Sequence, residues 1–317
     1  MNEIVNIMFS ERPLLITREG YHQVMMSLLP LLVRNKSEMP EAQSFFLEMK
    51  TYKTKAQEAF ENIKKILHED KLTEAISVTN EFSSPDIPAD SIAYHRVWGF
   101  ITACSHYCFS SKQLEQDLKE ADANPQISAH LLHINSSGGE AWYLDRLSET
   151  LDSLQKPVYT LCENCMCSAA YHIGCHGKQV YAVTQNDLVG CIGTMTSFHD
   201  YKGWYEQMGI KLVEAKATNS TLKNKIIDDL IDGKPEQFVH EILDPLNDQF
   251  LTDVKSHRKQ LADADADNPV LRGEVYYASR GQEMGLVDGL RTLPEVIAEL
   301  AGEIRAGHER NYILDHI

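Results

Sequence analysis

The chain has 317 residues, 43% of them hydrophobic, so it can bury the core of one large α/β domain and still supply a further segment. Its 46 acidic residues outnumber its 30 basic residues, giving a formal net charge of −16. This balance disfavours DNA or RNA as the main partner, because phosphate binding requires a basic face.

Signals for membrane insertion or secretion are weak. The longest apolar run near the N-terminus, VMMSLLPLLV at 24–33, is half the ~20 residues that span a bilayer, and Pro30 interrupts it. The run also lacks the basic start and cleavage site of a signal peptide. Seven cysteines, an odd number, fit a reducing compartment. We therefore expect a cytoplasmic protein without a membrane anchor.

The first 85 residues differ in pattern from the rest. Helices are predicted over 17–32 and 41–67, the second from apolar residues at three- and four-residue spacing. The stretch EFSSPDIPAD at 81–90 is typical of a linker, since it contains two prolines and two serines. This N-terminal part could bind a partner, cover an active site or make oligomer contacts, and we favour the last.

From about residue 91, strands and helices alternate, and the apolar pattern allows their positions to be predicted. Strands are predicted over 94–103, 129–135, 158–162, 180–183, 192–198, 211–214 and 275–278. Helices are predicted over 114–123, 140–154, 168–175, 201–208 and 236–261. Such alternation indicates βαβ units around a mostly parallel sheet. We expect three parts: a helical extension over 1–85, the main domain over 86–300 and a C-terminal tail over 301–317.

Two glycines follow the predicted strand over 129–135, in the run Ser136-Ser137-Gly138-Gly139. Glycines let the backbone turn sharply, and amides at the start of a helix can stabilise an anion such as the oxyanion of a tetrahedral intermediate. The alternative is a plain strand-to-helix turn.

A serine, Ser168, opens a predicted helix of small residues in the run SAAY at 168–171. A hydroxyl at a helix N-terminus lies where the dipole favours negative charge on an attacking oxygen. The alternative is an ordinary N-cap serine.

Two later segments complete the pattern: a glycine-bracketed strand entry, GCIG at 190–193, and a polar loop with two lysines, ATNSTLKNK at 217–225. A lysine can act as a base only when neutral, which requires burial to lower its pKa by several units. The alternative is that both lysines are solvated.

Taken in order, these segments resemble the signal peptide peptidase A (SppA) family of serine proteases, especially its soluble, phage-associated members. The family pattern is a strand, S-P-G-G, K-P-V, S-G-G-Y or S-A-A-Y, G-S-I-G, a lysine loop and G-L-V-D. The chain shows SSGG at 136–139, KPV at 156–158, SAAY at 168–171, GCIG at 190–193, the lysine loop at 217–225 and GLVD at 285–288. The resemblance covers residues 91–300 and implies a ClpP/crotonase-like α/β fold.

The resemblance also implies roles for individual residues. The family's nucleophile corresponds to Ser168 and its general base to Lys223, with Lys225 and then Lys216 in reserve. The oxyanion hole corresponds to Gly138 and Gly139, with the amide of Ala169 contributing.

Two positions depart from the family pattern. Ser137 replaces a proline, which should loosen the turn. Cys191 replaces a serine that can lie near the lysine amine in relatives, and a thiol is a poorer hydrogen-bond partner than a hydroxyl. Ser220 or Thr221 could take over that supporting role.

The implied activity is that of a serine endopeptidase with a Ser/Lys dyad, which forms an acyl-enzyme and needs no metal or organic cofactor. The resemblance further implies a homo-oligomeric, prophage-encoded enzyme that processes capsid, portal or scaffold proteins of a phage head, in the host cytoplasm or the prohead. Alternatives are an inactive structural component of a head assembly, a cytoplasmic peptidase that degrades signal peptides or proteins, and crotonase-type chemistry on acyl-CoA.

The sequence also offers other residues that could carry chemistry. Cys167 is an alternative nucleophile beside Ser168. One run offers ligands of the type that zinc binds: Cys162, Cys165, Cys167, His172, Cys175 and His176. The run is predicted to form a strand, a turn and a helix, so we do not expect these side chains to converge. Four acids match the spacing of an EF-hand loop: Asp263, Asp265, Asp267 and Glu274. Asn268 stands where that loop needs glycine, so we expect a solvated acidic loop and no metal site.

Overall fold

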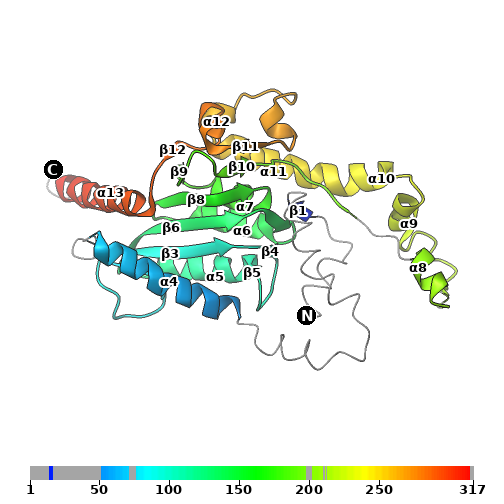
Figure 1. Ribbon diagram of the computed structural model, residues 1–317, viewed down its shortest axis with the longest axis horizontal. Helices are drawn as coiled ribbons and strands as arrows, with labels where there is room; N and C mark the ends of the chain where they lie inside the picture. Colours follow the sequence, from blue (N-terminus) through cyan, green and yellow to red (C-terminus); the bar gives the residue numbers. More distant parts are fainter. Residues whose placement is uncertain are drawn as a thin grey trace.

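The computed structural model describes residues 14–16, 51–70, 76–197, 202–209, 211 and 213–314. A mostly parallel sheet lies at the centre with helices on both faces (Figure 1). Its strand order is β11-β10-β8-β6-β3-β2, with β9 beside β8 and β12 beside β9. The strands are β2 (Val78–Thr79), β3 (Ser91–Trp98), β6 (Ile127–Ser136), β8 (Val158–Cys167), β9 (Gln179–Ala182), β10 (Leu188–Gly190), β11 (Val275–Tyr277) and β12 (Gly289–Leu290).

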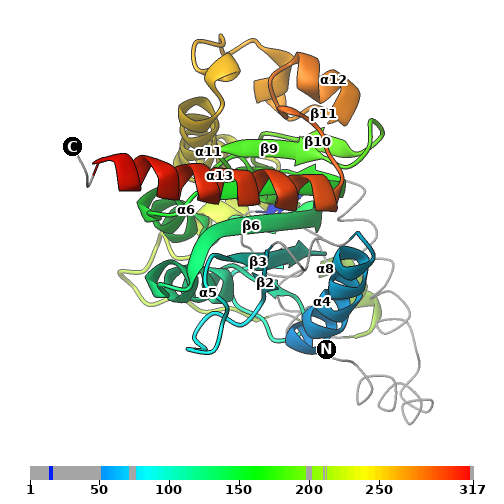
Figure 2. The same ribbon diagram turned by 90° about the vertical axis from the view of Figure 1, so that its left-hand side faces the viewer.

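Side chains of the central strands alternate between two cores. Leu132 of β6 and Cys162 of β8 belong to the core under α5, α6, α7 and α11, whereas Leu131 and Leu161 belong to the core under α4 and α13. Burial on both faces explains why these strands are apolar throughout. Figure 2 shows α5 and α6 on one side of the sheet and α4 on the other. The helices are α4 (Tyr52–Glu69), α5 (Ser111–Ala123), α6 (Leu144–Ser153), α7 (Ala169–Gly174), α11 (Asp244–His257) and α13 (Leu293–Leu314).

The helices nearest the two ends of the described chain pack on the same face of the sheet. Phe60 and Ile63 of α4 share a core with Leu300 and Ile304 of α13. The helix predicted over 41–67 is therefore found from Tyr52 onward, and residues 41–50 lie outside the described part, as does the helix predicted over 17–32. The sequence did not predict α13, which continues past residue 300 as one helix.

A second, smaller sheet has the order β1-β7-β4-β5. Its strands are β1 (Leu14–Ile16), β4 (Ile101–Thr102), β5 (Phe109–Ser110) and β7 (Gly138–Glu140). β1 runs antiparallel to β7, with Ile16 opposite Gly138 and Leu14 opposite Glu140. The helix predicted over 140–154 begins only at Leu144, because residues 138–140 form β7.

Two strand predictions were wrong. No strand forms over the described residues 192–197, and the strand of this region is β10, which ends at Gly190. Gly190 has φ +104° and Cys191 has φ +54°, so the backbone leaves the extended conformation there. The described residues of the segment 211–214 are also not in a strand.

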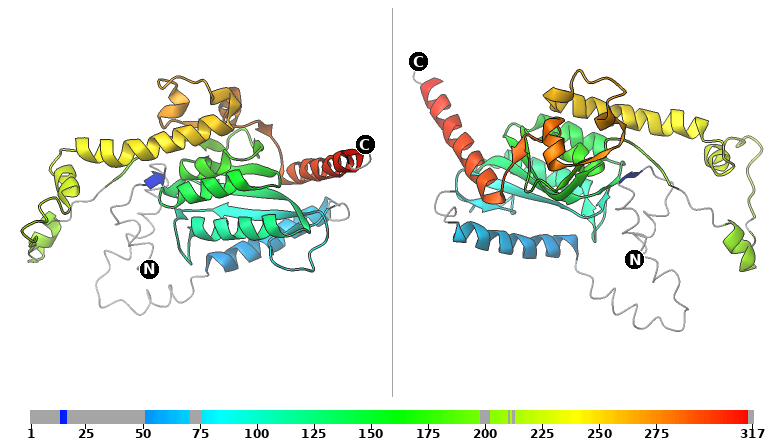
Figure 3. Two further views of the ribbon diagram at one scale, coloured as in Figure 1. Left: turned by 180° about the vertical axis from the view of Figure 1, so that it is seen from behind. Right: turned by 45° about the horizontal axis from the view of Figure 1, so that its top comes forward.

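The helix predicted over 236–261 is broken into four pieces, and the segment before it projects from the body of the molecule. The pieces are α10 (Glu236–Phe238), the π-helical turn η3 (Val239–Leu243), α11 and the 3₁₀ turn η4 (Lys259–Leu261). Figures 1 and 3 show α8 (Lys202–Gln207), α9 (Lys225–Ile231) and α10 extending away from the sheet, with α8 and α9 outermost. We call the segment from α8 to α10 the arm.

Within the described ranges, none of the helices combines the length and apolar character that crossing a bilayer requires.

Candidate active site

Ser168 lies at the junction between β8 and α7, with φ 57° and ψ −123°. Its amide donates a 2.8 Å hydrogen bond to the carbonyl oxygen of Gly190, and its own carbonyl accepts one from the amide of His172. The side chain does not cap the helix, and within the described residues its buried hydroxyl has no hydrogen-bond partner that meets normal geometry. The N-cap alternative is therefore wrong, and a buried serine hydroxyl is left free for another role.

The Cys191 thiol lies near this hydroxyl. Burial raises the pKa of the Cys191 thiol to about 11, and a contact with the Ser168 hydroxyl partly offsets that effect. The thiol therefore stays protonated at neutral pH. The amide of Cys191 donates to the carbonyl oxygen of Glu274 at 2.8 Å, which fixes the turn after β10.

Cys167, weighed as an alternative nucleophile, is fully buried. The neighbouring Cys165 thiol and burial together hold its pKa well above the usual value for a thiol. Since the thiolate is the reactive form, this environment makes Cys167 unreactive.

The two glycines of the SSGG run lie in β7, not at the start of a helix. Gly138 has φ +108°, and its amide donates to the Ser136 hydroxyl at 3.1 Å. A Cβ atom on Gly139 would lie 2.0 Å from the carbonyl oxygen of Ile101, so only glycine fits there. Ser136 pairs with Met166 of β8, which brings this run close to Ser168.

The outer edge of β7 accepts an extended peptide. Residues 14–16 of the chain occupy it as β1, antiparallel to Gly138–Glu140. The edge of β7 is thus suited to backbone pairing with a polypeptide, a recognition mode in which main-chain hydrogen bonds supply affinity.

The lysine loop is not near Ser168 within one chain. Lys223 is exposed and lies two residues before α9, at the outer end of the arm and well separated from α7 (Figures 1 and 3). Of the proposed supporting residues, Ser220 is half-buried and Thr221 is exposed.

The three lysines differ in their partners. Lys216 forms a 2.9 Å ion pair with Asp228, and Lys225 pairs with Asp229 one helical turn away. Lys223 forms no ion pair with any described residue. A base must be free to lose its proton, so the pairing of the other two favours Lys223.

The remaining family motifs hold α7 and the segments around it in place. The Tyr171 hydroxyl donates to the carbonyl oxygen of Leu286 at 2.9 Å. Asp288 of the GLVD run accepts from both terminal nitrogens of the buried Arg258, at 2.8 and 3.0 Å, and from the amide of Val180. Arg258 was missed in the sequence, where nothing distinguished it from a surface arginine.

The sequence contains two patterns of possible metal ligands. In the acidic run over 263–274, no three carboxylates lie together in the described part of the chain. In the Cys/His run over 162–176, only the last two residues meet a further ligand. Cys162, Cys165 and Cys167 lie along β8, but Cys175 and His176 meet His257 from α11.

These features define an α/β protein of the ClpP/crotonase-like class, with a serine at a sharp turn between a parallel strand and a short helix. Residues 150–306 match the sequence profile of Peptidase family S49, which identifies this part of the chain as a domain of that family. The predicted resemblance to SppA-type peptidases is thereby confirmed. The match includes Ser168 and the lysine loop and begins after Gly138 and Gly139.

Three relatives were found. The chain is 27% identical over 188 residues to the head-tail preconnector protein GP5 of Enterobacteria phage P21, covering 58% of this chain and 36% of that protein. It is 24% identical over 184 residues to Protease 4 of Haemophilus influenzae, covering 57% of this chain and 29% of that protein. It is 23% identical over 193 residues to the putative protease MJ0651 of Methanocaldococcus jannaschii, covering 58% of each. The matched region thus spans less than two thirds of each relative.

Proposed function

We propose that the chain is a serine endopeptidase in which Ser168 is the nucleophile and Lys223 the general base. The observation that carries this is the buried, uncapped hydroxyl of Ser168 at a turn with φ 57°. A hydroxyl so placed is free to attack a carbonyl once a base removes its proton.

The reaction would proceed through an acyl-enzyme. Neutral Lys223 takes the proton of the Ser168 hydroxyl, whose oxygen attacks the scissile carbonyl. The amides of Gly138, Gly139 and Ala169 stabilise the oxyanion, at about 3 kcal/mol per donor. The Gly138 amide donates to the Ser136 hydroxyl in this structure, so it would have to break that hydrogen bond in order to donate to the oxyanion. Protonated lysine then gives its proton to the leaving amine, and water hydrolyses the ester.

We propose that a neighbouring copy supplies the lysine. The arm that carries Lys223 lies away from Ser168 in one chain, and several of its apolar side chains are exposed. Val213 is 80% exposed, Leu222 76% and Ile231 52%. Docking of this arm on a second copy would bury these side chains and bring the loop to a site that lacks its base.

The substrate would be a protein segment bound as a strand along β7, where β1 lies in this structure. Similarity to a phage protein named as a head-tail preconnector supports a substrate among the proteins of a phage head, cleaved in the prohead or the host cytoplasm. The separation of the lysine loop from Ser168 favours one alternative, an inactive structural component of such an assembly.

Labelling with a fluorophosphonate probe tests the proposal, using the wild type beside Ser168→Ala, Lys223→Ala and Lys225→Ala. We expect labelling of the wild type and of Lys225→Ala alone. Labelling of Ser168→Ala would refute the nucleophile, and labelling of Lys223→Ala but not Lys225→Ala would move the base to Lys225. An assembled wild type that does not label would favour the structural alternative.

A further inference from the structure

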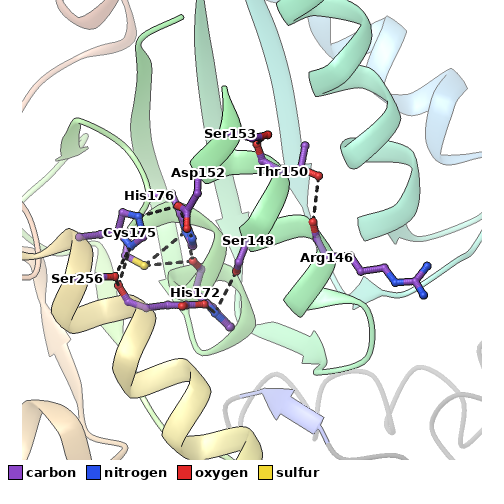
Figure 4. A network of polar contacts seen from close by, with 11 residues as sticks. Arg146, Ser148, Thr150, Asp152, Ser153, His172, Cys175, His176 and Ser256 are labelled. Carbon is purple, nitrogen blue, oxygen red and sulfur yellow. Dashed lines mark hydrogen bonds and ion pairs between the residues drawn. The ribbon is translucent and has the colours of Figure 1, made fainter. Parts of the chain in front are cut away.

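A cluster of metal-ligand side chains lies at the far end of the nucleophile helix. Cys175 and His176 directly follow α7, and His257 is the last residue of α11. One candidate ligand atom from each of these three residues lies within 4.8 Å of the other two. Asp152, near the end of α6, places Oδ1 2.8 Å from Nε2 of His257 and 3.6 Å from Nε2 of His176. Figure 4 shows Asp152, Cys175 and His176 converging beside Ser256 of α11.

The backbone fixes the same tautomer on both histidines. Nδ1 of His176 lies 2.9 Å from the carbonyl oxygen of His172, and Nδ1 of His257 lies 2.7 Å from that of Asp253. A carbonyl oxygen only accepts, so each Nδ1 carries the hydrogen, and in a neutral ring Nε2 then presents a lone pair. A histidine whose Nδ1–H is held by a carbonyl is the usual arrangement for a metal ligand.

Both lone pairs face an acceptor instead of a donor. Nε2 of a neutral His257 would meet the Asp152 carboxylate at 2.8 Å with no hydrogen between the two atoms. Nε2 of His176 is buried and has no hydrogen-bond partner among the described residues, and its side chain is only 1% exposed. Such an arrangement is unfavourable unless a proton or a metal cation lies between the groups.

The Cys175 thiol also belongs to the cluster. Cys175 is fully buried, and its thiol donates to the carbonyl oxygen of His172 at 3.2 Å. A bound transition metal would displace that proton and hold the thiolate.

We propose that Cys175, His176, His257 and Asp152 form a binding site for a divalent transition-metal ion, and that zinc is the ion this donor set fits. One sulfur, two imidazole nitrogens and one carboxylate make a four-coordinate set of the kind zinc prefers, whereas calcium and magnesium require oxygen ligands. Ligand atoms of tetrahedral zinc lie roughly 3.5 Å apart, so the other ligands would draw slightly together while Asp152 and His257, now 2.8 Å apart, move slightly apart. Asp152 is half exposed and leaves a path for the ion.

The ion would join three helices. It would link the end of α6 to the residues after α7 and to the end of α11. The six-residue α7 begins directly after Ser168, and α11 connects to the arm through η3. The site would therefore hold both the nucleophile helix and the root of the arm. A strand, turn and helix are expected to keep the run from Cys162 to His176 from converging, and only its last two residues meet here. His257 and Asp152 join them from distant segments that the local pattern does not connect.

Cobalt is a suitable probe, because a cobalt–thiolate bond gives a charge-transfer absorption. Metal-free full-length protein would be titrated with Co²⁺, and Zn²⁺ would then be used to displace it. We expect one equivalent of Co²⁺ with a thiolate band that Zn²⁺ abolishes. Cys175→Ser should remove the band, and His257→Gln should weaken affinity by more than about 100-fold, because even outer-shell changes cost 10–100-fold.

Matched controls are Cys104→Ser, at an exposed cysteine, and His308→Gln, at a surface histidine paired with Asp90. Both should bind as the wild type does. Circular dichroism shows whether Cys175→Ser folds. If it does not, Asp152→Asn, at a half-exposed side chain, is a second ligand variant and should weaken binding. A folded wild type that binds no stoichiometric Co²⁺ or Zn²⁺, or ligand variants that bind like the controls, would overturn the site. Because binding is read without peptidase activity, this result is independent of the proposed function.

Discussion

The amide of Ser168 donates a 2.8 Å hydrogen bond to the carbonyl oxygen of Gly190, the last residue of β10. β10 runs parallel to β8, with Gly190 opposite Cys167. The neighbouring strand, and not a side-chain cap, therefore holds the start of α7. The position of the Ser168 hydroxyl depends on the conformation of a glycine 22 residues later in the chain.

Replacing Gly190 should disturb the site from that neighbouring strand. Gly190 has φ +104°, and an added Cβ would lie 2.9 Å from the carbonyl oxygen of Glu274. We expect Gly190→Ala to lower the free energy of unfolding by about 1–3 kcal/mol and to slow fluorophosphonate labelling. Gly193→Ala is the control, since its nearest contact would be 3.4 Å. Equal labelling rates for the two variants would contradict the role given to Gly190.

Two inactive variants should restore each other if the dyad forms between copies. Lys223→Ala should lower turnover by about 10²–10⁴-fold, the contribution of a general base. Mixed with Ser168→Ala under conditions that exchange subunits, it should regain activity, because one copy supplies the serine and the other the lysine. Peptide hydrolysis measures this. A mixture no more active than its components would place both residues in the same copy.

Breaking the buried ion pair between Arg258 and Asp288 should destabilise the domain. Arg258 is 3% exposed, and Asp288 also accepts from the amide of Val180. We expect Arg258→Ala to cost about 3–5 kcal/mol, because it leaves a partly buried carboxylate without its partner. Urea unfolding measures the change. Arg280→Ala, at an exposed arginine, should cost less than about 1 kcal/mol. Similar costs for the two would show that the buried pair contributes no more than a surface pair.

Removing one hydroxyl tests the tyrosine of the SAAY run. Tyr171→Phe leaves the buried Leu286 carbonyl without the donor that lies 2.9 Å away, which should cost about 1–3 kcal/mol. The exposed Tyr277→Phe is the control and should be neutral. Thermal unfolding compares the two. A neutral Tyr171→Phe would mean that another group satisfies this carbonyl.

The loss of stability at low pH should depend on the protonation of the Asp122 carboxylate. A hydrogen bond from His130 lowers the pKa of Asp122, and the amides of Gln155 and Lys156 contribute. A lowered folded-state pKa adds stability above the unfolded value of about 3.9, and this stability is lost as the pH falls through the folded value. The difference in unfolding free energy between wild type and Asp122→Asn should therefore shrink below about pH 4. The control is Asp86→Asn, at an exposed side chain, and matching curves for the two variants would rule out the effect.

Local patterns predicted much of the central sheet. The apolar run of 129–135 became β6, and the small-residue helix after Ser168 became α7, since burial on both faces leaves a clear signal in composition. The predicted strand over 192–198 failed, because an apolar run does not reveal that Gly190 and Cys191 turn the chain at positive φ.

Ser168 could be singled out because its sequence motif is local, but other parts of the candidate site depend on distant contacts. His257 reaches His176 across 81 positions, and no periodicity encodes that meeting. The sequence drew attention to Gly138 and Gly139 because glycine allows a sharp turn. The structure shows that Gly139 must be glycine for another reason, which is the closeness of the Ile101 carbonyl in another strand. Arg258 is likewise buried by residues that are distant in the sequence, so the local pattern does not reveal its burial.

The backbone of Ser168 also has a thermodynamic consequence. At φ 57° and ψ −123° the residue occupies a conformation that glycine adopts freely and serine does not. Selection for stability alone would place glycine there, so a serine at this position opposes the folding of its own domain. A Ser168→Gly variant should consequently melt at a higher temperature than the wild type, and a library selected only for thermal resistance should converge on a protein without the proposed nucleophile.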